Sequence, residues 1–162
     1  MSLTSTQVDP ARLLLTLTVD LNATPEQAWQ LWADPRKLAR WLIPAPFTGS
    51  VQRHELTTAG DIVYSMTAPG GQSGLALLRV IHATAPTSLS YIDGLANADG
   101  SRLDGFPTAT IAVQLTARGG GTRMEVRSIF YNRQHMDDFI NVYGTVHAWE
   151  MVLKGMDAAL IA

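Results

Sequence analysis

The chain has 162 residues, of which 46% are apolar and 16% are charged, and its formal net charge is −2 at pH 7. This length fits a single domain spanning residues 1–162, and the apolar content is high enough to exclude wholesale disorder. The lack of a basic surplus argues against nucleic-acid binding, and the absence of cysteine excludes disulfides and thiol chemistry. We find no signal peptide and no apolar run of about 20 residues that could cross a bilayer, so we expect a cytoplasmic protein.

The first part of the chain predicts one strand followed by two short helices. Apolar and polar residues alternate over 13–21, which is the pattern of a half-buried strand. Thr24 and Gln27 have the spacing of a capping box around Pro25, so we expect a helix to begin there. An Asp-Pro pair at 34–35 is a second start signal and predicts another short helix.

Turn-rich segments containing glycine and proline divide the middle of the chain into further strands. Because turns this short join antiparallel neighbours, we expect an antiparallel meander. The predicted strands cover residues 48–56, 61–68, 75–84, 87–94, 108–117 and 122–131.

The last part of the chain predicts one long helix. No proline occurs between Asn132 and Leu160, and apolar residues recur there at steps of three and four. The resulting stripe comprises His135, Phe139, Val142, Val146, Trp149, Leu153, Met156 and Leu160. A coiled-coil seam has the same steps, but a single amphipathic sheet offers a nearer partner.

The sequence therefore predicts an α+β fold. In it, a curved antiparallel sheet of about seven strands wraps around a long C-terminal helix, with two short helices after the first strand.

Several stretches, in their order along the chain, resemble the Aha1-like branch of the START and Bet v 1-like helix-grip superfamily. This branch is named for the activator of Hsp90 ATPase. These stretches are residues 22–29, 38–47, 85–91, 120–124 and 148–153. The resemblance extends over roughly residues 12–161 and implies the helix-grip fold, with a cavity between sheet and helix whose contents vary across the superfamily. The chain departs from the family pattern at 52–55 and 94–107, where ligand or partner could differ.

The residues that commonly carry catalysis or bind metals are not arranged for those purposes. His135 and His147 lie twelve residues apart on the predicted helix and cannot share a metal, so we expect no metal and no cofactor. No Gly-x-Ser-x-Gly sequence indicates a triad hydrolase. The glycines at 119–121 join two predicted strands instead of opening a helix, which argues against a phosphate cradle.

Aromatic residues are concentrated on the elements expected to enclose the cavity, although core packing is the simpler role for each of them. Polar groups that could reach the cavity are Arg79, Asp93, Arg127, His135 and Tyr143. His135 is the best candidate for proton transfer because an imidazole titrates near neutral pH, and its alternative role is a histidine at the end of the core. We expect a ligand-binding set of Trp41, Phe47, Tyr64, Arg79, Tyr91, Phe106, His135, Phe139 and Tyr143, with His135 or Arg79 as polar anchor.

The main functional hypothesis is a binding protein for an apolar small molecule such as a lipid, a polyketide or an aromatic metabolite. One alternative is a cofactor-free enzyme, similar to a cyclase or hydrolase, that uses the same cavity. Another is a co-chaperone that stimulates an Hsp90-type ATPase. We expect neither nucleic acid nor membrane as a partner, and both a monomer and a homodimer remain open.

Overall fold

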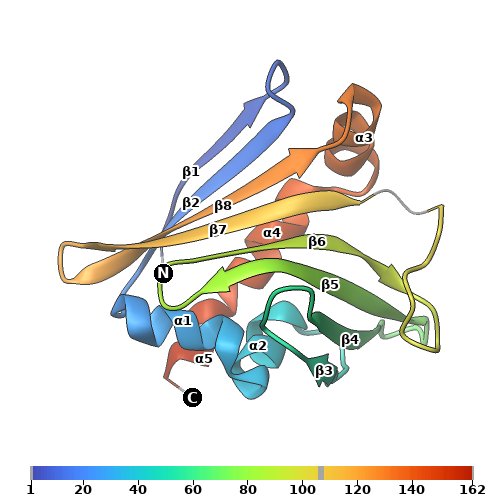
Figure 1. The fold of residues 1–162 in the computed structure, drawn as a ribbon, viewed down its shortest axis with the longest axis horizontal. Helices are drawn as coiled ribbons and strands as arrows, with labels where there is room; N and C mark the ends of the chain where they lie inside the picture. The colour runs from blue at the N-terminus through green and yellow to red at the C-terminus, as the bar shows by residue number, and fades with distance from the viewer. Residues whose placement is uncertain (1, 106–107, 162) are drawn as a thin grey trace.

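The computed structural model describes residues 2–105 and 108–161. Within these residues the chain forms one antiparallel sheet of eight strands, which curves around the C-terminal helical segment (Figure 1). The strand order is β1-β2-β8-β7-β6-β5-β4-β3, so β1 and β3 form the two edges. The strands are β1 (Ser2–Asp9), β2 (Leu14–Leu21), β3 (Val51–His54), β4 (Asp61–Thr67), β5 (Ser73–Thr84), β6 (Ser88–Ala96), β7 (Ala109–Arg118) and β8 (Gly121–Phe130).

The predicted α+β helix-grip architecture is confirmed, and the sheet has eight strands where about seven were predicted. The additional strand is β1, which pairs with β2 along the edge of the sheet. A bulge between Leu3 and Ser5 shifts its register, and most of its side chains are exposed. An edge strand that buries little and is interrupted by a bulge gives no regular alternation in the sequence.

The two predicted short helices are confirmed as α1 (Pro25–Ala33) and α2 (Pro35–Leu42). The capping box at the start of α1 is formed in both directions. The Gln27 backbone N–H donates to Thr24 Oγ1 at 3.2 Å, and the Thr24 backbone N–H donates to Gln27 Oε1 at 2.9 Å. Asp34 caps α2 by accepting from the backbone N–H of its second residue. These local signals explain why both helix starts could be predicted.

The same helices bring a group of tryptophans into the core. Trp32 and Trp41 are fully buried and meet edge to face, with ring centroids 4.7 Å apart. The indole N–H of Trp41 donates to the Leu31 carbonyl oxygen at 2.8 Å. The ring of Trp32 also lies 5.8 Å from the ring of Tyr91 on β6. Large aromatic side chains therefore fill the concave side of the sheet beside α1 and α2.

The C-terminal segment is helical, but the prediction of one continuous helix was wrong. It is divided into α3 (Arg133–Asp137), the π-helical turn η1 (Asp138–Val142), α4 (Thr145–Lys154) and α5 (Met156–Leu160). Gly144 separates η1 from α4 with a φ of 62°, the left-handed conformation that ends a helix. The π-helical turn and this break change the side of the helical segment on which the following residues lie.

The shift in phase decides which members of the predicted stripe reach the core. Phe139, Leu153 and Met156 are buried, whereas Trp149 is only half-buried and Val142 is 70% exposed. The steps of three and four therefore persist in the sequence, but they do not describe one face of one helix.

Figure 1 shows α4 crossing the sheet and α5 beside α1 and α2. The contacts agree, because α5 packs on both short helices and Lys37 Nζ donates to the Ala159 carbonyl oxygen at 2.9 Å. The end of the chain thus completes the tryptophan-rich part of the core, and α4 is left opposite β4, β5 and β6. No helix in the described ranges is long and apolar enough to cross a membrane.

Candidate functional site

A cavity of about 130 Å³ lies between the sheet and α4. Strands β4, β5 and β6 provide one wall, α4 provides the other, and the last residue of α2 lies at its margin. The lining residues are Leu42, Tyr64, Leu78, Tyr91, Asp93, Thr145, Ala148, Trp149 and Val152. Asp93 is the charged member of this set, and most of the others are apolar or aromatic.

The register of the sheet explains why the polar groups meet here. Tyr91 and Asp93 are two residues apart on β6, so both point to the concave face. Leu78 on β5 lies opposite Asp93 and also opposite Ile62 on β4. Tyr64, two residues beyond Ile62, shares its face. Strands β4 and β6 therefore direct two hydroxyls and one carboxyl into the same space, and β5 between them adds the apolar side chain of Leu78.

Burial raises the pKa of Asp93 to about 6, although the charge of Arg102 and the backbone N–H of Gly94 act in the opposite direction. Burial and the negative charge of Asp93 raise the pKa of both Tyr64 and Tyr91, so the two hydroxyls stay protonated at neutral pH. Within residues 2–105 and 108–161, no side chain forms a hydrogen bond with any of these three polar groups. The cavity thus holds two donors and one acceptor that lack side-chain partners.

Arg102, whose charge acts on Asp93, lies outside the cavity. Its guanidinium group sits against Gly94, in the space that a Cβ would occupy, and Nη2 donates to the Ile92 carbonyl oxygen at 3.5 Å. Because neighbouring residues of a strand point to opposite faces, the side of Gly94 is not the side of Asp93. The positive charge therefore acts through the sheet and provides no cation inside the cavity.

Of the residues predicted to bind a ligand, Tyr64 and Tyr91 line this cavity. Trp41 is fully buried among the tryptophans, and Phe47 is half-buried against the core. Phe139 is buried against Phe130, with ring centroids 5.4 Å apart, and Tyr143 is 50% exposed. These four lie outside the cavity lining, and Phe106 lies outside the described residues.

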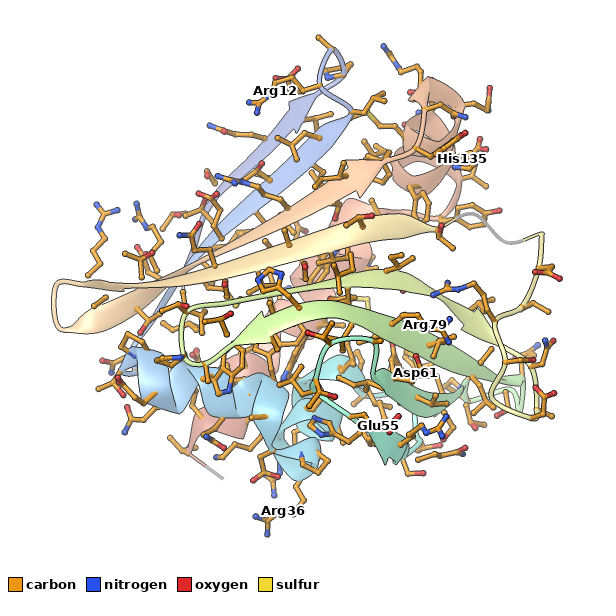
Figure 2. The ribbon with its side chains drawn as sticks, viewed as in Figure 1. Arg12, Arg36, Glu55, Asp61, Arg79 and His135 are labelled. Atoms are coloured by element: carbon orange, nitrogen blue, oxygen red, sulfur yellow. The ribbon has the colours of Figure 1, made fainter. Side chains whose placement is uncertain are left out.

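The two predicted polar anchors lie elsewhere. Arg79 forms a bidentate ion pair with Asp61 on the neighbouring strand, at 2.9 and 3.1 Å, and its side chain is half exposed. His135 lies on α3, with its ring 5.7 Å from that of Tyr131 and a buried Nδ1 that has no hydrogen-bond partner in the described residues. Figure 2 shows Arg79 beside Asp61 and His135 well away from both. Neither anchor contributes to the lining of this cavity.

Asp93 was one of the polar candidates in the sequence but was not included in the predicted binding set. A signal for it exists, because Leu89, Tyr91 and Asp93 share one phase of the β6 alternation and the first two are buried. A charged residue in a buried phase is uncommon unless it has a partner. The α4 residues that line the cavity could not be predicted from the sequence, because the direction of α4 depends on the break at Gly144. In the described part of the chain, no three His, Asp or Glu side chains are grouped to hold a metal ion.

The family described as "Activator of Hsp90 ATPase homolog 1-like protein" matches residues 22–160. The chain belongs to this family. Two similar solved structures are 26% identical in sequence. One, from Mycobacterium smegmatis, has a TM-score of 0.87 over 97% of this chain and 96% of that one. The other, from Arthrobacter aurescens, has a TM-score of 0.89 over 98% and 92%.

A more distant structure comes from Silicibacter pomeroyi and is itself described as an Activator of Hsp90 ATPase homolog 1 (AHSA1) protein. It is 20% identical, with a TM-score of 0.69 over 91% of this chain and 97% of that one. No curated protein matches the chain. Family and fold agree with the helix-grip architecture, which is consistent with either a ligand-binding or a co-chaperone-like domain.

Proposed function

We propose that this protein binds a compact, largely apolar small molecule in the cavity between β4–β6 and α4. The observation that supports this most directly is the set of polar groups from Tyr64, Tyr91 and Asp93, which converge on a mostly apolar space. A ligand that offers hydrogen bonds to these groups would be oriented by them while burying its apolar body.

The size of the cavity limits the ligand. An apolar cavity of about 150 Å³ in another protein accommodates benzene, so about 130 Å³ suits a single ring or a short branched chain. Burying about 200 Å² of apolar surface at ~25 cal/mol per Å² contributes about 5 kcal/mol, which offsets part of the cost of association. A long-chain lipid would need a larger space than this.

The proposal can be tested with benzyl alcohol, a neutral single-ring probe, titrated by calorimetry or by chemical-shift changes. Ala148 lines the cavity from α4 at a position that is itself exposed, so Ala148→Leu should narrow the opening and weaken binding at least tenfold. Ala158 is exposed on α5, and Ala158→Leu is a matched control that should bind as the wild type does. Absence of saturable binding to the wild type, or equal affinity in the Ala148→Leu protein, would contradict the proposal.

A second candidate, a co-chaperone for an Hsp90-type ATPase, is supported by the description of the family. The region around α3 and η1 also exposes large side chains, with Tyr131 81% and Val142 70% accessible. Stimulation of an Hsp90 ATPase that is lost on replacing both residues by Ser, and kept in the Ala148→Leu protein, would favour this function. If neither the wild type nor the Ala148→Leu protein stimulates the ATPase, ligand binding is the better explanation of what the protein does.

A further inference from the structure

The cavity contains a negative charge without a positive one. Asp93 is the charged residue in the lining, and its pKa of about 6 leaves the carboxyl ionised at neutral pH. An ionised carboxylate removed from water is costly unless a cation or several hydrogen-bond donors compensate it. Arg102 compensates Asp93 only in part, because its guanidinium group lies against Gly94 on the other side of β6. The side of the carboxylate that faces the cavity therefore remains available for a cation.

The remaining walls also favour a cation. Tyr64, Tyr91 and Trp149 place three aromatic side chains around the same small space as Asp93. The faces of aromatic rings attract organic cations, most strongly those of Trp and Tyr, and the effect grows when the site is desolvated. The α4 residues of the lining, Thr145, Ala148, Trp149 and Val152, bring no charge that would oppose this.

We propose that the cavity takes a small organic cation, an ammonium group on a single ring or short chain. Its charge would lie beside Asp93 and its apolar body against Tyr64, Tyr91 and Trp149. This inference rests on the proposed ligand-binding function and specifies the class of ligand. A volume of about 130 Å³ admits benzylammonium or tetramethylammonium.

The test compares benzylammonium with benzyl alcohol, which has the same ring and no charge, at pH 7.5. Wild-type protein should bind the cation at least tenfold more tightly than the alcohol. Asp93→Asn should reduce that ratio to about one. Asp99→Asn removes the same charge from an exposed position in the β6–β7 connection and should leave the ratio unchanged.

The pH dependence provides a test that needs no variant. The groups facing Asp93 are the Tyr64 and Tyr91 hydroxyls, which stay neutral, and the guanidinium group of Arg102 beyond the sheet. Only the Asp93 carboxyl changes charge in this set between pH 5 and pH 7.5. Affinity for benzylammonium should therefore fall severalfold as the pH is lowered through about 6, and affinity for benzyl alcohol should not.

The two proposals fail in different ways. If benzyl alcohol binds saturably and benzylammonium binds no tighter, the cavity is a ligand site but the cation assignment is wrong. The same holds if benzoate binds more tightly than benzylammonium. A cation preference that survives in the Asp93→Asn protein would also overturn it. If neither probe binds, the ligand-binding function itself fails, and the cation assignment fails with it.

Discussion

The concave side of the sheet has two parts that are built from similar side chains but packed differently. Beside α1, α2 and α5, Trp32 and Trp41 are fully buried, touch each other and leave no exposed ring. Beside α4, Trp149 is half-buried, and the tyrosines of β4 and β6 line a cavity. Aromatic residues thus fill one part of the concave side of the sheet and border a cavity in the other part.

The difference follows from which helices cover each part. Three helices from both ends of the chain converge on the tryptophan-rich part, with α5 packed on α1 and α2. One helix, α4, covers β4–β6, and it begins after a left-handed glycine instead of continuing from α3. A carboxylate at Asp93 further prevents dry apolar packing there. An aromatic-rich sequence can therefore produce either a core or a binding site, depending on how many elements cover it.

The largest expected effect is in the closed part. Trp41→Ala removes a fully buried ring together with its hydrogen bond to the Leu31 carbonyl, so it should lower the free energy of unfolding by about 3–5 kcal/mol. Equilibrium denaturation in urea measures this directly. A loss below about 1 kcal/mol would mean that the side chains beside α1, α2 and α5 do not form a closed core.

The charge in the open part should make stability depend on pH. The folded-state pKa of Asp93 is raised from 3.8 to about 6, so between these values the folded protein binds more protons than the unfolded chain. Stability contributed by this group is therefore complete below about pH 4 and is lost as pH rises through about 6. The loss is at most about 3 kcal/mol. Asp93→Asn should remove it and make the variant more stable than the wild type at pH 7.5.

A matched carboxylate outside the cavity should behave in the opposite way. Arg123 donates to Asp20 at 2.9 and 3.0 Å and holds the pKa of that carboxyl below its usual value. Its contribution is present at neutral pH and lost as the pH falls, so Asp20→Asn should destabilise the protein at pH 7.5 and have less effect in acid. If denaturation curves show the same sign for Asp20→Asn and Asp93→Asn, the environment assigned to Asp93 is wrong.

Local signals in the sequence account for what could be predicted. The capping box at Thr24 and Gln27, and the alternation in most strands, depend on neighbours in the chain and survive in the structure. The strand Ser2–Asp9 carries no such signal, because it is an exposed edge with a bulge. The cavity depends on the position of α4, which a single φ angle at Gly144 redirects. Tyr64 and Tyr91 could be assigned to it from their strands, whereas the residues of α4 could not.

A smaller effect is expected at the tryptophan of the open part. Trp149 is half-buried and already borders a cavity, so Trp149→Ala should cost only about 1–2 kcal/mol of stability. The same change removes one aromatic wall and should weaken binding of benzylammonium more than it weakens folding. Urea denaturation gives the loss of stability, and titration of the same sample with benzylammonium gives the loss of affinity. A stability loss as large as that of Trp41→Ala would show that both parts of the groove are packed alike.

The smallest effect is expected at the hinge between η1 and α4. Gly144 has a φ of 62°, where a Cβ is disfavoured by about 1–2 kcal/mol, and no atom lies within 4 Å of the position that its Cβ would occupy. Gly144→Ala should therefore lower stability by about 1 kcal/mol through backbone strain alone. Gly144→Asn should cost less, because Asn adopts the left-handed conformation more readily. If both variants are as stable as the wild type in urea, Gly144 does not hold this conformation. The break that separates α4 from the predicted continuous helix would then have another cause.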